Sequence, residues 1–316
     1  MVGRVSAIVP CYNAGRYLAD TLRGIRSQTI PFEEIIVVDD GSSDNTSAVA
    51  AACTCTVIRH TRNRGLAAAR NTGIENARSA LVACIDADVV LATDWLANLL
   101  PEFRDPDVVQ GGGRIVERHQ SSAADRWRAL YMKLDYGDSP RKIDQRSPGR
   151  LSGFATLARR EALQAVGLYD CRFGRSYEDV DISTRLIDQG YTLSYAPQAI
   201  CYHNRSDTLQ SLLASCWSWA FWPASFEGCY RSAWAVLSKV RGNLSACLER
   251  SREHVATGDY ALLCIDGSLL ILSSIWDIRY YLSLRFSLAR AVLGPGHLGN
   301  IGSGSATSAE HPSAPA

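Results

Sequence analysis

Short apolar runs alternate with segments of helical periodicity along the first ninety residues. The apolar runs have strand length and lie at residues 5–9, 35–38, 56–59 and 81–85. Helical spacing of apolar positions occupies the intervals between them, at 16–27, 45–52 and 66–77. This order predicts βαβ units around a parallel sheet. Because right-handed crossovers bring the loops after parallel strands to one edge, residues that follow these runs should meet there.

The pattern changes after residue 88. A helix is expected at 94–103 and an extended run at 108–117, followed by a polar stretch at 119–150 that is typical of a lid or partner-binding loop. A run at 150–158, a helix at 160–166, an acidic segment at 178–181 and a strand at 193–196 follow. We therefore expect an α/β fold with a mostly parallel sheet and helices on both faces.

The chain divides by composition into three parts. Residues 1–206 carry the α/β pattern, and 207–293 read as a helical C-terminal region that contacts the acceptor, another copy of the chain or a membrane surface. Residues 294–316 are rich in Gly, Ser, Ala and Pro, which predicts a disordered tail. Apolar stretches at 208–226 and 262–276 contain Pro223 and Asp266 respectively, so neither is expected to span a membrane.

Charge and cysteine content narrow the functional classes. A formal net charge of +1 offers no electrostatic case for nucleic acid as a partner. Ten cysteines lack the paired spacing of a metal site, and they read as small core residues in a reducing compartment. We expect a cytoplasmic protein.

Acidic residues follow the predicted strands in three groups. Asp39 and Asp40 end one apolar run, Asp86 and Asp88 end another, and Glu178 and Asp179 precede a helix. Turn chemistry would explain the first group, and the helix dipole would explain the third. Carboxylates converging at one sheet edge would instead supply a divalent metal site and a general base.

Five motifs resemble those of family 2 inverting glycosyltransferases of the GT-A fold. They are VSAIVPCYN (5–13), EIIVVDDGS (34–42), NRGLAAARN (63–71), the D-x-D sequence DAD (86–88) and ED (178–179). The resemblance covers residues 5 to about 203, in the order and spacing of that family. It implies the GT-A fold and transfer of a sugar from a nucleoside diphosphate donor.

The resemblance also implies a donor site. Asp40 would accept a hydrogen bond from the imide N–H of uracil, because an ionised carboxylate is only an acceptor and uracil presents a donor there. Tyr12 would stack on the base and Pro10 would shape the floor. Arg70 would lie near the base or the diphosphate, and Gly153 would allow the backbone to approach the sugar.

The reacting groups follow from the same resemblance. Asp88 would ligate Mn²⁺ or Mg²⁺, Asp86 would contact ribose or a metal-bound water, and His203 would lie near the metal or diphosphate. Asp179 would take the proton of the acceptor hydroxyl, with Glu178 positioning it or holding the acceptor.

The predicted activity is therefore metal-dependent, inverting transfer from a UDP-sugar to a hydroxyl of a glycan, a lipid-linked acceptor or a protein, as in EC 2.4 enzymes. A Gln-x-x-Arg-Trp motif is absent from the sequence, so one sugar per turnover is expected. A GDP-sugar donor and a catalytically silent binding protein remain alternatives. A nucleotidyltransferase would need a Gly-rich, Arg-containing loop after the first strand, which residues 11–16 do not supply.

Aromatic residues gather in the C-terminal region. They are Trp217, Trp219, Phe221, Trp222 and Trp234. Such a cluster indicates core, an interface between copies in a homo-oligomer, or a peripheral contact with the inner face of the membrane.

Overall fold

A computed structural model describes residues 4–132, 136–173, 176–216 and 230–293. The chain forms two compact units, Met1–Ser206 and Asp207–Ala316, called here the α/β unit and the helical unit. The expected tail at 294–316 and four of the C-terminal aromatic residues, Trp217 to Trp222, lie outside the described residues.

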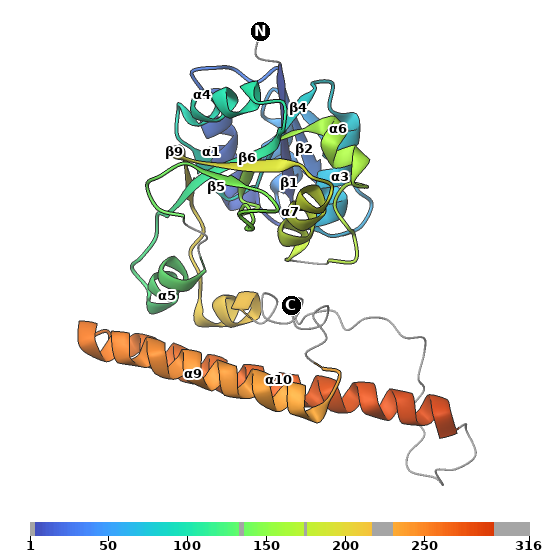
Figure 1. Cartoon of the computed structure of the whole chain (residues 1–316). Coiled ribbons are helices and arrows are strands. Elements are labelled where there is room, and N and C mark those ends of the chain that lie inside the picture. Colours follow the sequence, from blue (N-terminus) through green and yellow to red (C-terminus); the bar gives the residue numbers. More distant parts are fainter. Residues whose placement is uncertain (1–3, 133–135, 174–175, 217–229, 294–316) are drawn as a thin grey trace. The chain divides into compact units, whose positions relative to one another are not determined.

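Nine strands within the described residues form one sheet in the α/β unit, in the order β3-β2-β1-β4-β8-β6-β9-β5, with β7 paired to β9 (Figure 1). The strands are β1 (Val5–Cys11), β2 (Glu34–Asp39), β3 (Thr56–Arg59), β4 (Leu81–Ile85), β5 (Val89–Leu91), β6 (Val108–Glu117), β7 (Arg141–Ile143), β8 (Ala155–Arg159) and β9 (Thr192–His203). The α/β fold is confirmed. The sheet is mixed rather than mostly parallel, because β4 and β6 both pair antiparallel with β8, whereas β1 to β4 are parallel.

Helices cover both faces of the sheet (Figure 1). They are α1 (Gly15–Arg26), α2 (Thr46–Ala51), α3 (Leu66–Asn76), α4 (Trp95–Leu99), α6 (Arg160–Ala165) and α7 (Glu178–Asp188). Helix α5 (Ala123–Tyr131) lies away from both faces of the sheet (Figure 1). Successive residues of β1 point to opposite faces: Ala7 and Val9 pack in the core beneath α1 and α4, and Ile8 packs with α3, α6 and α7. The alternation of strand residues thus builds two apolar layers, one on each face of the sheet.

Some boundaries differ from the sequence-based expectation. The helix predicted at 94–103 ends at Leu99 and continues as a 3₁₀ turn over Leu100–Arg104, where Pro101 lacks the N–H for a further α-helical bond. The polar stretch at 119–150 contains α5 and β7. Strand β9 begins where expected but continues to His203, because it pairs with β6, β7 and β5.

The helical unit contains α9 (Ala233–Thr257) and α10 (Tyr260–Leu293), joined at Gly258 in the left-handed conformation (Figure 1). Within the described residues, one helix segment, Tyr260–Arg285, is long and apolar enough to cross a membrane, with a mean hydropathy of 1.7. The expectation that Asp266 interrupts this stretch is wrong, since Asp266 lies inside α10, buried and paired with Arg250 at 2.6 Å.

Candidate active site

Asp40 follows β2 and is 2% exposed. Its Oδ1 lies 2.6 Å from Nδ1 of His60 and accepts a hydrogen bond from the backbone N–H of Arg64, and its Oδ2 accepts one from Gly65. A carboxylate has about four acceptor positions, so three contacts leave one for a ligand donor. Asp40 fixes the loop before α3, and its predicted contact with uracil stays a prediction.

The predicted base-binding residues lie at the end of β1. Pro10 is the last but one residue of the strand, and Tyr12 follows it with half of its surface exposed. Asn13 continues the turn in the left-handed region, and its amide oxygen accepts from the N–H of Ser43. Strands β1 and β2 are hydrogen-bonded neighbours, so the turn that carries Tyr12 lies beside Asp40, which follows β2. An exposed aromatic ring at this position is suited to stacking on a base.

Asp86 and Asp88 lie in the turn between β4 and β5, and each carboxylate remains about one fifth exposed. Burial raises the pKa of Asp86 to about 6, against the opposing charge of Arg70. Burial also raises the pKa of Asp88, but the hydrogen bond and charge of His203 outweigh it, and the net pKa is lowered. One carboxylate of the pair is therefore held ionised more firmly than the other.

Arg70, on α3, is 1% exposed and connects the predicted metal and base groups. Its Nη2 donates to Asp86 at 2.7 Å and to the carbonyl of Gly153 at 2.9 Å, and its Nη1 donates to Glu178 at 2.6 Å. The guanidinium also lies over the ring of Tyr169. Whether Arg70 also reaches the diphosphate stays a prediction.

Asp179 lies in the first turn of α7 and accepts two backbone hydrogen bonds. The N–H of Gly153 donates to its Oδ2 and the N–H of Val180 to its Oδ1, both at 2.9 Å. A Cβ on Gly153 would lie 3.0 Å from Cβ of Asp179 and 3.3 Å from Nη2 of Arg70. Gly153 is thus needed to bring the candidate base close to Arg70. Its predicted approach to the sugar stays a prediction.

Glu178 is buried beside the same arginine. Burial raises its pKa to about 7, since desolvation and the charge of Asp179 outweigh the attraction of Arg70. One guanidinium cannot neutralise Asp86, Glu178 and Asp179 together, so this cluster favours an added proton or cation. Because Glu178 is inside and Asp179 is partly exposed, Asp179 is the better placed of the two to meet an acceptor.

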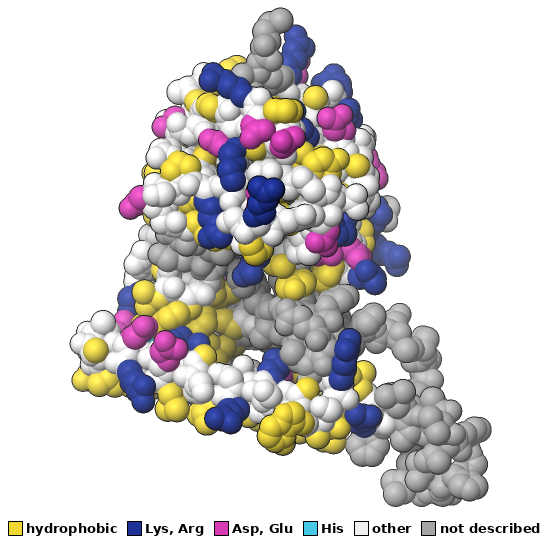
Figure 2. Space-filling view, viewed as in Figure 1, with side chains coloured by type: hydrophobic (Ala, Val, Ile, Leu, Met, Phe, Trp, Pro, Cys, Tyr) yellow, Lys and Arg dark blue, Asp and Glu magenta, His cyan; other side chains and the backbone are white. Residues whose placement is uncertain are grey.

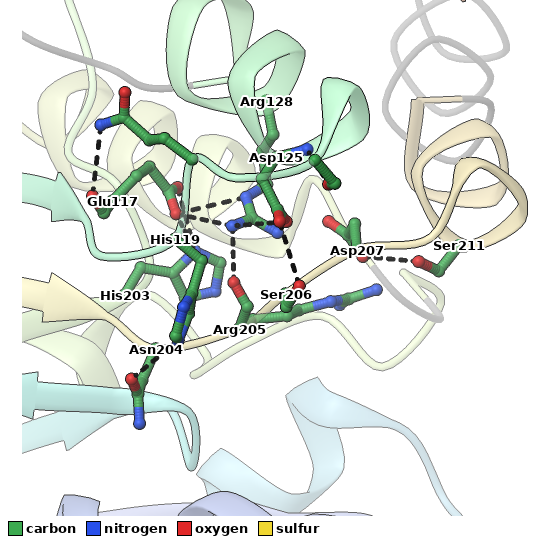
Figure 3. Close-up of polar contacts among 12 residues, drawn as sticks. Glu117, His119, Asp125, Arg128, His203, Asn204, Arg205, Ser206, Asp207 and Ser211 are labelled. Carbon is green, nitrogen blue, oxygen red and sulfur yellow. Dashed lines mark hydrogen bonds and ion pairs between the residues drawn. The ribbon is translucent and has the colours of Figure 1, made fainter.

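His203, at the end of β9, connects Asp88 to a second buried network (Figure 3). Its Nδ1 lies 3.0 Å from both carboxylate oxygens of Glu117, and its Nε2 lies 3.4 Å from Asp88. Arg128 of α5 donates to Glu117 at 2.9 Å and to the carbonyl of Arg205 at 2.6 Å. Burial lowers the pKa of His203, but its bonds to Asp88 and Glu117 raise it to about 9.

The donor set fits a hard divalent cation only with help from a substrate. Among the described residues, no three His, Cys, Asp or Glu side chains are arranged to hold a metal ion by themselves. Asp88 and Asp86 keep exposed carboxylate surface, and a magnesium-type site commonly uses one or two carboxylates with substrate phosphates. Metal binding would require His203 to lose its Nε2 proton, and Glu117 on Nδ1 would then leave Nε2 directed toward Asp88, as in carboxylate–histidine–metal arrangements. The metal ligation by Asp88, Asp86 and His203 stays a prediction.

The profile of Glycosyl transferase family 2 matches residues 6–167, half of the chain. This protein belongs to glycosyl transferase family 2. A pre-mycofactocin glycosyltransferase of Mycobacterium tuberculosis is 34% identical over 66% of this chain, which spans 44% of that relative's length. A poly-beta-1,6-N-acetyl-D-glucosamine synthase of Staphylococcus epidermidis is 28% identical over 90% of this chain and 69% of that protein.

Solved structures confirm the GT-A fold of this family 2 protein. A mannosyltransferase of Pyrobaculum calidifontis, in complex with GDP-Man and Mn²⁺, aligns over 88% of each chain with a TM-score of 0.60 and 21% identity. TarS of S. aureus (residues 1–349), in complex with UDP-GlcNAc, aligns over 68% of this chain and 64% of that one, with a TM-score of 0.51 and 18% identity. The two neighbours hold different nucleotide sugars, so the fold does not select the donor.

Three site residues were not found by sequence reasoning: His60, Glu117 and Arg128. Each is buried, and its partner is distant in sequence, as with Glu117 and His203. The position of Glu117 at the end of the extended run at 108–117 was the one local signal, since polar residues at strand ends gather at this edge.

Proposed function

We propose that this chain is a metal-dependent, inverting glycosyltransferase that moves one sugar from a UDP-sugar to an acceptor hydroxyl. The observation that carries the proposal is a continuous set of contacts from the candidate base to the candidate metal group. Asp179 accepts from the N–H of Gly153, the carbonyl of Gly153 accepts from Arg70, and Arg70 donates to Asp86. Base and metal group are thereby held in one rigid arrangement.

The chemistry is a single displacement at the anomeric carbon. The acceptor oxygen forms a bond to that carbon as the bond to the diphosphate oxygen breaks, and Asp179 takes the hydroxyl proton. The two backbone N–H groups on Asp179 keep its carboxylate oriented toward the acceptor. A divalent ion held by Asp88, and by Asp86 or His203, would neutralise charge on the departing diphosphate.

Arg70 and Glu178 act as positioning residues in this scheme. Both are buried, so neither is placed to contact a bulk acceptor. Arg70 holds Asp86 directly and Asp179 through the backbone of Gly153, and Glu178 bonds to the other end of the guanidinium. Nucleotide selectivity would rest on Asp40 and Tyr12. A GDP-sugar donor is the alternative, since a structural neighbour with GDP-Man shares the fold.

We place the reaction in the cytoplasm, a reducing compartment that suits cysteines without the spacing of a disulfide framework. The acceptor is a hydroxyl of a glycan, a lipid-linked molecule or a protein.

Similarity to a polysaccharide synthase over 90% of this chain favours repeated addition of sugars as a second candidate activity. Product mass separates the two, because a single added sugar supports our proposal and a ladder of sugars contradicts it.

Calorimetric titration with UDP and GDP, each with and without Mn²⁺, tests the donor site. We expect UDP to bind more tightly than GDP, to require Mn²⁺, and to lose binding in Asp88→Asn. Asp94→Asn is the matched control, because Asp94 is an exposed acid six residues away, before α4. Metal-free binding equal to that with Mn²⁺ would contradict the metal site, and tighter GDP binding would contradict the uracil contact.

A further inference from the structure

Polar residues face inward in the helical unit. Asp266 and Asp277 of α10 are buried against α9. Asp266 pairs with Arg250 at 2.6 Å, and Asp277 pairs with Lys239 at 2.6 Å and accepts from the hydroxyl of Tyr230 at 2.7 Å. Buried charges of this kind are tolerated because each has a counter-charge and hydrogen-bond partners.

Apolar residues of the same two helices face outward. The exposed residues are Leu237, Leu244, Leu248 and Val255 on α9, and Ile271, Ile275, Ile278 and Leu282 on α10. Their spacings of three, four, seven and eleven residues place each set on one face of its helix. All eight are between 44% and 60% exposed. In Figure 2 hydrophobic side chains line the edge of this hairpin, with Lys and Arg between them.

This distribution departs from that of a helix pair that is stable in water, although Val236, Leu262 and Ile265 are buried. A water-soluble hairpin buries its apolar stripes against each other and leaves charges outside. Here two aspartates and their partners are inside and two apolar stripes are outside beside exposed charges, and exposed apolar stripes on neighbouring helices mark an interaction surface. An apolar medium would remove the exposed faces from water while the internal ion pairs stay satisfied.

The charges around the stripes favour lipid over a second copy of the chain. In the described part of 231–285, five arginines are exposed (Arg231, Arg241, Arg252, Arg279 and Arg285) against two glutamates (Glu249 and Glu253). Arg241 and Arg252 each follow a leucine of the α9 stripe by four residues, so they border that face. Two like faces would repel one another, whereas anionic headgroups would attract them.

We propose that the α9–α10 hairpin binds the headgroup–acyl boundary of an anionic lipid bilayer through these two outward apolar faces. The exposed charges of α9 keep that helix out of the hydrocarbon core, so the hairpin lies along the interface although α10 alone is long enough to cross. Trp234 is 79% exposed at the start of α9, where an indole suits the interface.

Vesicle flotation of the full-length chain tests the proposal. We expect it to float with vesicles of equal parts phosphatidylcholine and phosphatidylglycerol, less with phosphatidylcholine alone, and to be released by alkaline carbonate. Leu248→Glu with Ile275→Glu should weaken binding roughly tenfold or more. Ile30→Glu is the matched control, because Ile30 is a comparably exposed isoleucine of the α/β unit. Arg241→Gln should weaken binding to the anionic vesicles about fivefold.

Hydrogen exchange on the unmodified chain gives a readout that does not depend on the folding of any variant. Vesicles should protect backbone amides of α9 and α10 from exchange and leave β1 to β4 unchanged. The proposal is overturned if the chain does not float, if the double variant floats as well as the unmodified chain, if carbonate fails to release it, or if vesicles protect neither helix. Self-association through Ile275 without vesicle binding would likewise assign the faces to a second copy.

Discussion

Replacing Arg70 by methionine should strongly destabilise the α/β unit. The substitution keeps a long side chain but removes the donors to Asp86, Glu178 and the carbonyl of Gly153. Buried Glu178 and Asp86, whose carboxylate is about one fifth exposed, then lose their counter-charge, which costs about 3–5 kcal/mol of the free energy of unfolding. For a unit of this size that corresponds to a fall in melting temperature of roughly 6–20 °C. The matched control is Arg78→Met, whose side chain is 78% exposed and pairs with Glu34, so its expected cost is below about 1 kcal/mol.

The pH dependence of this loss tests the electrostatic cause. The pKa values of Asp86 and Glu178 are raised, to about 6 and about 7, chiefly by burial. At pH 5 both carboxyls are mostly protonated in the folded state, so the arginine neutralises little and its loss should matter less than at pH 8. Urea unfolding of both variants and the unmodified chain, without metal, at the two pH values measures this. An equal loss at pH 5 and pH 8, or a loss matching that of Arg78→Met, would refute the reasoning.

Three further predictions concern the same site. Gly153→Ala should lower kcat in a steady-state assay roughly tenfold to 100-fold, because the added methyl group displaces the candidate base. Gly112→Ala is the control and should leave kcat unchanged, since its Cβ would meet nothing closer than 3.5 Å. Glu117→Gln should weaken Mn²⁺ binding roughly 10- to 100-fold, because His203 loses its orienting carboxylate. Electron paramagnetic resonance with nucleotide present measures this affinity, and an unchanged affinity would contradict the prediction. The unmodified chain should lose stability as pH rises from 4 to 7, because the pKa of Asp86 is raised to about 6 in the folded state. Asp86→Asn lacks this titration, so its stability in urea unfolding should rise relative to the unmodified chain over the same interval. A difference between the two proteins that does not change with pH would contradict the shift.

Local pattern was sufficient for most of the α/β unit. The strands at 108–117 and 81–85 have the predicted bounds. Such strands can be predicted because apolar runs and alternation depend only on residues that are close in sequence. Arg70 was identified by its motif, but its environment was not. A surface arginine and a buried one have the same local sequence, and only the approach of Gly153 and Glu178 from distant segments removes it from water.

The helical unit shows a different limit. In the sequence, Asp266 is a charged residue within the apolar stretch 262–276, and no basic residue near it in that stretch indicates an ion pair. In three dimensions Arg250 and Asp266 lie opposite one another across the hairpin, and the charge no longer faces the apolar side. For the same reason the sequence did not identify Glu117 and Arg128 as site residues. Their place in the site depends on the contact of Glu117 with His203, which lies 86 residues after Glu117.

The position of His203 at the end of β9 also sets the order in which the site is completed during synthesis. Strands β1 to β4 pair as a parallel set that is complete at residue 85, whereas β9 pairs with β5, β6 and β7 and ends at residue 203. At ribosomal speeds the intervening 118 residues take roughly 6–24 s to emerge. A nascent chain therefore carries Tyr12, Asp40 and Asp88 for seconds before His203 is synthesised, and the proposed metal group is completed after the proposed nucleotide-binding residues.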